Sequence, residues 1–253
     1  MTIDLPRHTQ IPQLRALWKE AFGDPDAYLD LFFNTAFSPS RCLCITEGDE
    51  VTAALYWFDC SFDGHPLAYV YAVATAQSRR GQGLCRALMT HTHRHLKQNG
   101  YLGVILVPGS DSLFSLYGKM GYSICSSVGE LTCRAAEPAA VLYELSVEEY
   151  AQSRRTLLPQ GGVVQEGENL RFLATQFSFW GSSSFVLAAR IEGEQLFCAE
   201  LLGDLTQAPA ILTALGCTQG HFRTVGQTRP FAMYLSLSDT PTQPPCYFGF
   251  AFD

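Results

Sequence analysis

The sequence lacks any apolar run long enough to cross a membrane, and its first residues, MTIDLPRHTQ, contain no hydrophobic secretion segment. A membrane span needs about 20 predominantly apolar residues in a row, whereas the apolar runs here are short and broken by polar residues. We therefore expect a protein without membrane association, located in the cytoplasm.

Positive charge is also in short supply, because 17 Lys and Arg residues face 24 Asp and Glu residues and the net charge is -7. Nucleic-acid binding depends on neutralising phosphates with basic side chains, so we expect no nucleic-acid partner. A basic small molecule such as an amine is attracted instead. The 47% of hydrophobic residues predicts a packed protein, and 253 residues fit one large domain or two small ones.

Paired metal-binding spacings are missing as well. The nine cysteines include no C-x-x-C pair, which a zinc site commonly uses, so we expect them to have packing roles. His91, His93 and His95 are two residues apart, and on a helix only the first and last of them share a face. We therefore interpret these histidines as part of a solvent-exposed helix face and expect no metal.

Hydrophobic periodicity in the first half predicts helices and strands in mixed order. Two helices are expected over residues 11–37, and three strands between residue 42 and about residue 75, with turns at Gly48 and Gly64. A helix that stops at Gly100, a buried strand over 101–108 and a short helix that stops at Gly121 follow. The fold class is therefore α/β.

The second half is less marked. We predict helices in SVEEYAQSRRTLL, EGENLRFLATQFSFW and TQAPAILTALG, a hairpin that turns at Gly193, and strands in RPFAMYLSL and CYFGFAFD. The segment from NLRFLATQF to FCAEL echoes that from YLDLFFNTAF to ALYWF, with Gly48 and Gly193 as corresponding turn glycines. This pattern indicates either an internal duplication or simply two similar helix–hairpin units. The second copy has no Gly-rich loop.

The segment VYAVATAQSRRGQGLCRALM places a loop with Gly81 and Gly83 between an apolar strand and a helix. Free backbone amides and the dipole at a helix start attract an anion, and glycine lets a phosphate approach the backbone. Arg79, Arg80 and Arg86 add positive charge. The spacing does not match G-x-G-x-x-G or the Walker pattern, so by itself the loop predicts only an anion site.

This segment resembles motif A of the GNAT N-acetyltransferase superfamily, in which Arg or Gln is followed by x-x-G-x and then Gly or Ala. Of the registers that start at Ser78 and Arg80, we prefer Arg80-x-x-Gly83-x-Cys85, which supplies the basic residue but departs from the family at Cys85. LFSLYGKMGYS resembles motif B of the same family through Tyr117, Lys119, Gly121 and Tyr122. The resemblance covers residues 1–130 and is strongest over 70–122.

The resemblance implies acetyl-CoA as the acyl donor. The backbone of three strand residues would bind the pantetheine arm, namely Val73, Ala74 and Thr75. The pyrophosphate would be held by the loop and the first turn of the helix, namely by Arg80, Gly81, Gln82, Gly83, Leu84, Cys85 and Arg86. Tyr117 would donate a proton to the departing thiolate. The alternative for Tyr117 is a buried aromatic residue whose hydroxyl is satisfied.

The layout also resembles the two-part acetyltransferases of the enhanced-intracellular-survival type. This resemblance implies a GNAT acetyl-CoA-binding domain over residues 1–130 and a degenerate GNAT-like α+β half over residues 131–253. The sheet of the first domain should be mixed and mostly antiparallel, flanked by helices, and should splay where strand 68–75 meets strand 102–108.

The resemblance thus implies an acetyl-CoA-dependent N-acetyltransferase, a monomer or dimer, in which a small-molecule or peptide amine attacks the thioester directly. Two alternatives stay open: a non-catalytic acyl-CoA-binding sensor or interaction module, and an acyltransferase with a larger donor. We identify no general base, although Asp59 and the terminal carboxylates at Asp253 are candidates. The aromatic runs Phe32-Phe33 and 177–180 are interpreted as core, with an acceptor pocket as the alternative.

Overall fold

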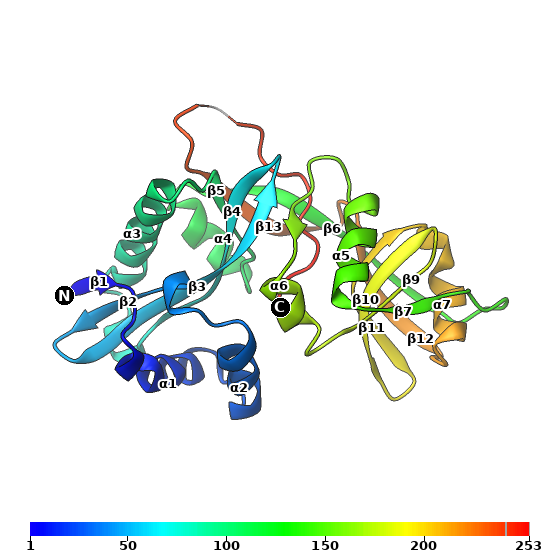
Figure 1. Cartoon of the computed structure of the whole chain (residues 1–253), viewed down its shortest axis with the longest axis horizontal. Coiled ribbons are helices and arrows are strands. Elements are labelled where there is room, and N and C mark those ends of the chain that lie inside the picture. The colour runs from blue at the N-terminus through cyan, green and yellow to red at the C-terminus, as the bar shows by residue number, and fades with distance from the viewer. Residues whose placement is uncertain (241, 253) are drawn as a thin grey trace.

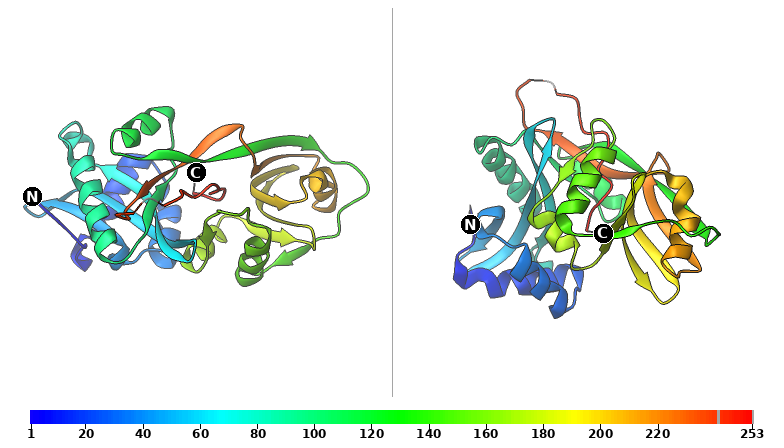
Figure 2. Two further views of the ribbon diagram at one scale, coloured as in Figure 1. Left: turned by 90° about the horizontal axis from the view of Figure 1, so that it is seen from above. Right: turned by 45° about the vertical axis from the view of Figure 1, so that its right-hand side comes forward.

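One continuous sheet connects the two halves of the chain and forms a lobe at each end (Figures 1 and 2). The computed structural model describes residues 1–240 and 242–252. In these residues the 13-stranded sheet has the order β1-β2-β3-β4-β5-β13-β6-β12-β11-β10-β9-β7, and β8 pairs with β3 off this path. No helix in the described part of the chain is long and apolar enough to span a membrane.

The first half alternates helices and strands as predicted. Its elements are β1 (Thr2–Asp4), α1 (Ile11–Phe22), α2 (Asp26–Thr35), β2 (Cys42–Glu47), β3 (Glu50–Phe62), β4 (His65–Thr75), α3 (Leu84–Gln98), β5 (Gly103–Leu106), α4 (Asp111–Gly118) and β6 (Ser123–Arg134). The expected helices and turns are confirmed, whereas strands β1 and β6 were not predicted. Gly23 ends α1 in the left-handed conformation, with φ 74°, and its N–H donates to the carbonyl of Lys19.

The second half contains β7 (Tyr143–Leu145), α5 (Val147–Leu157), β8 (Val164–Gln165), α6 (Glu168–Leu173), β9 (Ser178–Gly181), β10 (Phe185–Glu192), β11 (Gln195–Gly203), α7 (Ala208–Ala214), β12 (Gln219–Val225) and β13 (Arg229–Ser236). The helix predicted in EGENLRFLATQFSFW is only partly correct, because it ends at Leu173 and Ser178–Gly181 pairs with β10 as a strand. Aromatic residues at this position suit a pleated strand.

The strand predicted in CYFGFAFD is wrong. In its described residues the segment makes a single isolated bridge, between Tyr247 and Gly162. Side chains of other elements bind its backbone instead: Ser126 Oγ accepts from Phe248 N–H at 3.0 Å, and Gln165 Nε2 donates to the Phe250 carbonyl at 2.8 Å. Satisfied in this way, the tail needs no strand partner.

Both halves contain the same succession of elements around a parallel strand pair. In the first half β4 and β5 are parallel and joined through α3, and in the second half β11 and β12 are parallel and joined through α7. Antiparallel strands extend outward from each pair, β3-β2-β1 and β10-β9-β7. The second half therefore repeats the α+β arrangement of the first half, as the resemblance implied.

The topology corrects the proposed correspondence of turn glycines. Counted outward from the parallel pair, the β10–β11 hairpin with its turn at Gly193 occupies the place of the β3–β4 hairpin, which turns at Gly64. The hairpin that turns at Gly48 lies one strand further out. The sequence similarity thus aligned two hairpins whose positions in the two half-sheets differ by one strand.

Each half receives a strand from the other. β13 lies between β5 and β6, and the C-terminal part of β6 pairs with β12. Figure 2 shows β6 as a long ribbon that runs from one lobe to the other. Because β6 passes through the predicted boundary between residues 130 and 131, the division into 1–130 and 131–253 stays a prediction.

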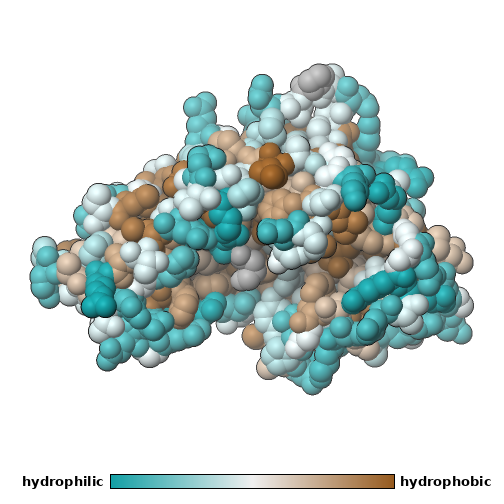
Figure 3. Space-filling model, turned by 180° about the vertical axis from the view of Figure 1, so that it is seen from behind, coloured by the Kyte–Doolittle hydropathy of each residue, from teal (hydrophilic) through white to brown (hydrophobic). Residues whose placement is uncertain are grey.

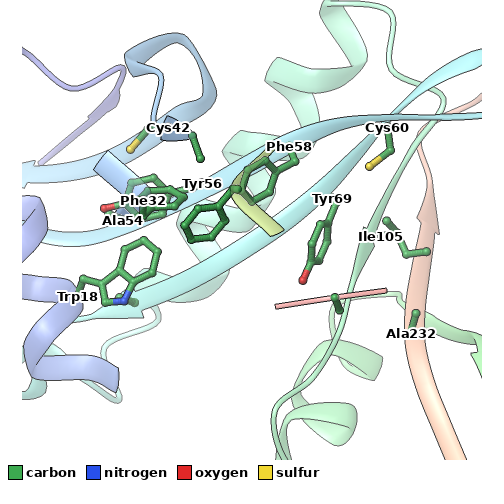
Figure 4. Packing of buried hydrophobic residues seen from close by; sticks show 14 of the residues in the cluster. Trp18, Phe32, Cys42, Ala54, Tyr56, Phe58, Cys60, Tyr69, Ile105 and Ala232 are labelled. Atoms are coloured by element: carbon green, nitrogen blue, oxygen red, sulfur yellow. The ribbon is translucent and has the colours of Figure 1, made fainter. Parts of the chain in front are cut away.

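The core of the first half is built from aromatic rings. Trp18 of α1 and Phe32 of α2 point toward Tyr56 and Phe58 of β3 (Figure 4). The centroids of Trp18 and Phe32 are 4.6 Å apart, and those of Phe32 and Tyr56 are 5.2 Å apart. These contacts bury Trp18, whereas Phe22, which has the same helical spacing, is 47% exposed. They confirm that Phe32 belongs to the core.

A buried ion pair connects the elements of the second half. Arg154 of α5 and Glu200 of β11 are 2% and 0% exposed and lie 2.7 Å apart. The hydroxyls of Tyr150 and Tyr247 donate to the Glu200 carboxylate at 2.7 and 3.1 Å. Arg154 also donates to the Val163 carbonyl at 3.0 Å. This network joins α5, β11 and the C-terminal tail through fully paired charges.

The predicted solvent-exposed face of histidines is wrong, because His91, His93 and His95 are all half-buried. Nε2 of His93 lies 2.8 Å from the Tyr122 hydroxyl, so this residue joins α3 to the segment that follows α4. Burial lowers the pKa of His93 from 6.5 to about 4. Periodicity assigned this position to the outside because it did not foresee that Tyr122 covers it.

We predict that Glu200→Gln lowers the free energy of unfolding by about 3–5 kcal/mol, because it leaves the Arg154 charge buried without its partner. Glu192→Gln is the matched control, since its ion pair with Arg190 on the same hairpin is about half exposed. Such a pair contributes about 0–1 kcal/mol. Urea unfolding of both variants measures the difference, and equal effects would contradict the role given to the buried pair.

A second prediction concerns acid stability. The unfolded chain binds a proton at His93 near pH 6.5 and the folded chain only near pH 4. Between these values the unfolded state therefore binds more protons, and stability falls as the pH drops. His93→Gln should flatten this part of the wild-type dependence. Urea unfolding between pH 7 and pH 4 tests this, and an unchanged slope in His93→Gln refutes it.

Candidate active site

The sheet opens between β4 and β5. The two strands pair only at Leu67 with Gly103, Ala68 with Val104 and Tyr69 with Ile105. β4 then continues to Thr75, whereas β5 ends at Leu106. Beyond Tyr69, no described strand pairs with this edge of β4. The splay predicted where strand 68–75 meets strand 102–108 is confirmed.

A β-bulge distorts β4 at the point where the strands part. The pairing of β4 with β3 shifts register between the pair Tyr56–Tyr71 and the pair Ala54–Ala74. Ala72 lies in this interval and has φ 48°, a conformation that non-glycine residues seldom adopt. Bulges redirect backbone groups beside functional sites. No feature of the sequence indicated this bulge.

A cavity of about 630 Å³ occupies the splay. It is lined on one side by residues 70–73 of β4, and on the other by Leu106 and Val107 at the end of β5 and by Leu113 and Tyr117 of α4. Of the residues predicted to act on a ligand, the structure thus brings Val73 and Tyr117 to one cavity. A volume of this size suits a small-molecule site.

The glycine loop lies at the start of α3, and its residues are not among those that line the cavity, although Arg86 contacts the Lys119 carbonyl just after α4. Gly81 and Gly83 have φ 76° and 80°, and Gly83 is the residue before the first helical turn. The first α-helical bond runs from Ala87 N–H to the Gly83 carbonyl. The amides of the three residues between them therefore precede the helical bonds and are free for a ligand. A Cβ added at either glycine meets no atom within 4 Å, so the space over the loop is open.

Two of the three arginines near the loop keep their charge available. Arg80 Nε donates to the Thr75 carbonyl at 3.2 Å, and an Arg86 guanidinium nitrogen donates to the Lys119 carbonyl at 3.3 Å. Both side chains are exposed, and backbone carbonyls orient them without neutralising them. Arg79 instead forms an ion pair with Glu47 at 2.6 Å. These features fit a phosphate-bearing ligand.

Tyr117 is 7% exposed, and burial raises its pKa well above the ordinary value, with the nearby Cys85 as a further cause. Its ring packs edge-on against Tyr122, with centroids 5.8 Å apart. Within residues 1–240 and 242–252, its hydroxyl has no hydrogen-bond partner. Tyr117 therefore keeps its proton near neutral pH and can donate it into the cavity.

The two candidate general bases differ in their position relative to the cavity. Asp59 does not line the cavity: one carboxylate oxygen accepts from the Tyr101 hydroxyl at 2.5 Å, and the other lies 3.4 Å from Arg41. Asp253 lies outside the described residues. The residue before it, Phe252, lines the cavity. Groups of His, Cys, Asp and Glu that could hold a metal ion are not found in the described residues.

The far end of the cavity consists of residues that the sequence did not single out as a site. They come from α1, from α2 and the turn between these helices, from β4 and from two segments of the second half, and are Trp18, Asp24, Tyr28, Tyr71, Gln176 and Phe252. The aromatic runs that were considered for an acceptor pocket, Phe32-Phe33 and 177–180, do not line it. Only the assembled fold brings Gln176 and Phe252 next to α1, so no local pattern could have revealed them.

Among its described residues, the second half shows no splay like that between β4 and β5. β11 and β12 are paired as far as Leu201 and Thr224, with one irregularity between Cys198 and Leu201. Before α7 the Asp204 carboxylate accepts from the Thr206 amide at 3.0 Å. An acidic side chain thus occupies the place where the first half has a glycine loop.

Comparison with known proteins agrees with this architecture. Residues 2–125 match the family model of an acetyltransferase (GNAT) domain. A GCN5-related N-acetyltransferase from Kribbella flavida superimposes with a TM-score of 0.71 at 16% identity, covering 92% of this chain and 70% of that chain. Eis1 from Mycobacterium abscessus superimposes with a TM-score of 0.69 at 13% identity, covering 94% and 74%.

A putative acetyltransferase from Pyrococcus horikoshii covers 99% of this chain and 94% of its own length, with a TM-score of 0.66 and 11% identity. At such identities the likeness concerns the fold alone, and it extends over both halves. No curated protein matches the sequence. Residues 2–125, which contain the splayed sheet and the glycine loop, thus match the GNAT acetyltransferase domain.

Proposed function

We propose that the protein is an acetyl-CoA-dependent N-acetyltransferase that acts on an amine by direct attack on the thioester. The observation that carries the proposal is the cavity in the splay, where the unpaired edge of β4 and the free hydroxyl of Tyr117 meet. We further expect it to act in the cytoplasm, as a monomer or dimer.

The residues around the splay fit the parts of an acyl-CoA molecule. The unpaired edge formed by Val73, Ala74 and Thr75 offers backbone groups to a pantetheine arm. The amides from Gly81 to Arg86 and the side chains of Arg80 and Arg86 suit a pyrophosphate, since they combine free N–H groups with positive charge. Gln82 in this loop is exposed and contacts the Ser78 carbonyl only at 3.5 Å.

When bound, acetyl-CoA supplies a thioester whose carbonyl carbon accepts a nucleophile and whose sulfur departs as a thiolate. A neutral amine in the cavity forms the new C–N bond while the C–S bond breaks. Tyr117 donates its hydroxyl proton to the thiolate and regains a proton from solvent, which receives the one that the amine loses. The balance is an amide and a free thiol, and holding the two reactants together supplies much of the rate.

We predict that Gly83→Ala weakens CoA binding by at least about tenfold, because a methyl group at this position keeps a phosphate from the loop amides. Gly100→Ala is a matched control at the other end of α3. Its φ of 82° is close to that of Gly83, and there too an added Cβ meets no atom within 4 Å. Both variants therefore carry the same backbone strain.

Isothermal titration of CoA into the two variants separates the effects. Unfolding midpoints should fall by similar amounts, and only Gly83→Ala should lose affinity. Equal affinities in both variants would show that the loop does not bind phosphate.

A further prediction is that Tyr117→Phe lowers kcat by about 10²–10⁴-fold, as for the loss of a general acid, while CoA binding persists. Phenylalanine keeps the edge-on contact with Tyr122, so folding should be preserved. Thiol release measured at saturating acetyl-CoA tests this. Unchanged turnover removes Tyr117 from the mechanism.

The proposal as a whole is tested by thiol release from acetyl-CoA across a panel of small-molecule and peptide amines. Turnover with at least one amine supports it. CoA binding without turnover across the panel indicates a non-catalytic sensor instead. A thermal shift with longer acyl-CoA molecules and none with acetyl-CoA indicates another donor.

A further inference from the structure

The far end of the cavity is an aromatic enclosure around one carboxylate. We call it the amine subsite and define it by Trp18, Asp24, Tyr28, Tyr71, Gln176 and Phe252. Ring centroids of Trp18 and Tyr71 lie 5.4 Å apart, and those of Tyr71 and Phe252 lie 5.0 Å apart. Aromatic faces attract cations as well as apolar groups. A cationic molecule with an apolar body therefore matches this lining.

Asp24 gives the subsite its charge, and it is the only acidic residue among the described residues that line the cavity. One of its oxygens accepts from Trp18 Nε1 at 2.8 Å, which fixes the carboxylate without neutralising it. Burial raises the pKa of Tyr28 and of Tyr71, and the charge of Asp24 raises both further. The carboxylate thus acts on the hydroxyl pair of these two tyrosines, whose oxygens are 2.7 Å apart.

The charge of Asp24 excludes the interpretation that this carboxylate binds the reacting nitrogen itself. The reacting amine has to be neutral, and a carboxylate beside it would favour its protonated form. Asp24 also belongs to the enclosure beside α1 and α2, whereas Tyr117 belongs to the wall formed by α4. A carboxylate in this place suits a second basic nitrogen of the same acceptor, one that stays charged during the transfer.

The second half of the chain closes the subsite. Phe252 is packed among Phe58, Tyr71 and Phe172, with ring centroids 4.8–5.0 Å away. The cavity of about 630 Å³ has to hold the thioester end of the donor together with the acceptor. This leaves room for a compact acceptor rather than for a folded protein surface.

We propose that the amine subsite selects small diamines: one nitrogen, uncharged, receives the acetyl group near Tyr117, and the other, as an ammonium, pairs with Asp24. The apolar body between them lies against the rings of Trp18, Tyr28 and Tyr71. This inference rests on the proposed function for its chemistry, but binding of the diamine does not require turnover. In this scheme Asp24 determines specificity and takes no part in the proton transfer from Tyr117.

The test measures binding of matched pairs by isothermal titration, without donor. Diamines from 1,4-diaminobutane to 1,8-diaminooctane, and p-xylylenediamine, are each compared with the monoamine in which a methyl group replaces one amino group. We expect at least one diamine to bind about tenfold more tightly than its partner, as for a charge-assisted hydrogen bond. Asp24→Asn should abolish that preference, since asparagine keeps an oxygen acceptor for Trp18 Nε1 but loses the charge.

Asp26→Asn is the matched control, because Asp26 lies two residues further on, pairs with Lys19 at 2.7 Å and does not line the cavity. It should retain the preference for the diamine. With turnover as readout, Asp24→Asn should raise KM for the diamine and leave KM for acetyl-CoA unchanged.

Three results overturn the proposal: monoamines that bind as tightly as diamines, a preference that persists in Asp24→Asn, or no binding by any diamine. CoA titration in parallel separates this failure from that of the proposed function. Intact CoA binding without diamine preference removes only the subsite, whereas diamine preference without CoA binding removes only the transferase.

Discussion

The buried pair of Arg154 and Glu200 is the interaction that anchors the C-terminal tail and, through the tail, the part of the cavity wall that the second half contributes. Its energy alone does not explain its presence, because a buried ion pair gains little over well-packed apolar residues. The pair instead fixes the relative positions of three segments. Glu200 accepts from the hydroxyls of Tyr150 and Tyr247, so α5, β11 and the C-terminal tail meet at this carboxylate. From Tyr247 the tail runs on to Phe252 at the cavity. Phe252, a wall residue of the amine subsite, is thus positioned by the buried charges of the second half.

The exchange of strands makes the two halves interdependent. β13 completes the sheet of the first half beside β5, and β6 carries that sheet on to β12. Because β5 is only four residues long, pairing with β13 on its other side is what keeps it in the sheet once it parts from β4. The splay that forms the cavity therefore depends on a strand contributed by the end of the chain.

Local signals in the sequence were sufficient for the elements but not for their long-range pairing. The apolar spacing of Leu14, Leu17 and Trp18 and the glycines at turns and helix ends correctly predicted most of the first half, and the two motifs led to the splay. β6 was not predicted because SICSSVGELTCR has no clear alternation of apolar and polar residues. The aromatic tail after Cys246 has the composition of a strand, but side chains of other elements bind its backbone. Asp24 looked like part of a turn between Gly23 and Pro25, and only the packing of the halves gives it a cavity to line.

The contrast between the halves indicates how two units of the same topology can have different roles. In the second half the strands that correspond to the splayed pair remain paired as far as Leu201, and the Asp204 carboxylate accepts from the Thr206 amide just before α7. Both features oppose a phosphate-bearing ligand, the first by closing the gap and the second by negative charge. The same half contributes Gln176 and Phe252 to the cavity of its counterpart. On the proposed function, the first half holds the donor and the second half shapes the place of the acceptor. A change in acceptor specificity then requires substitutions in the second half or in the segment from α1 to α2. Such substitutions do not disturb the loop that binds the donor.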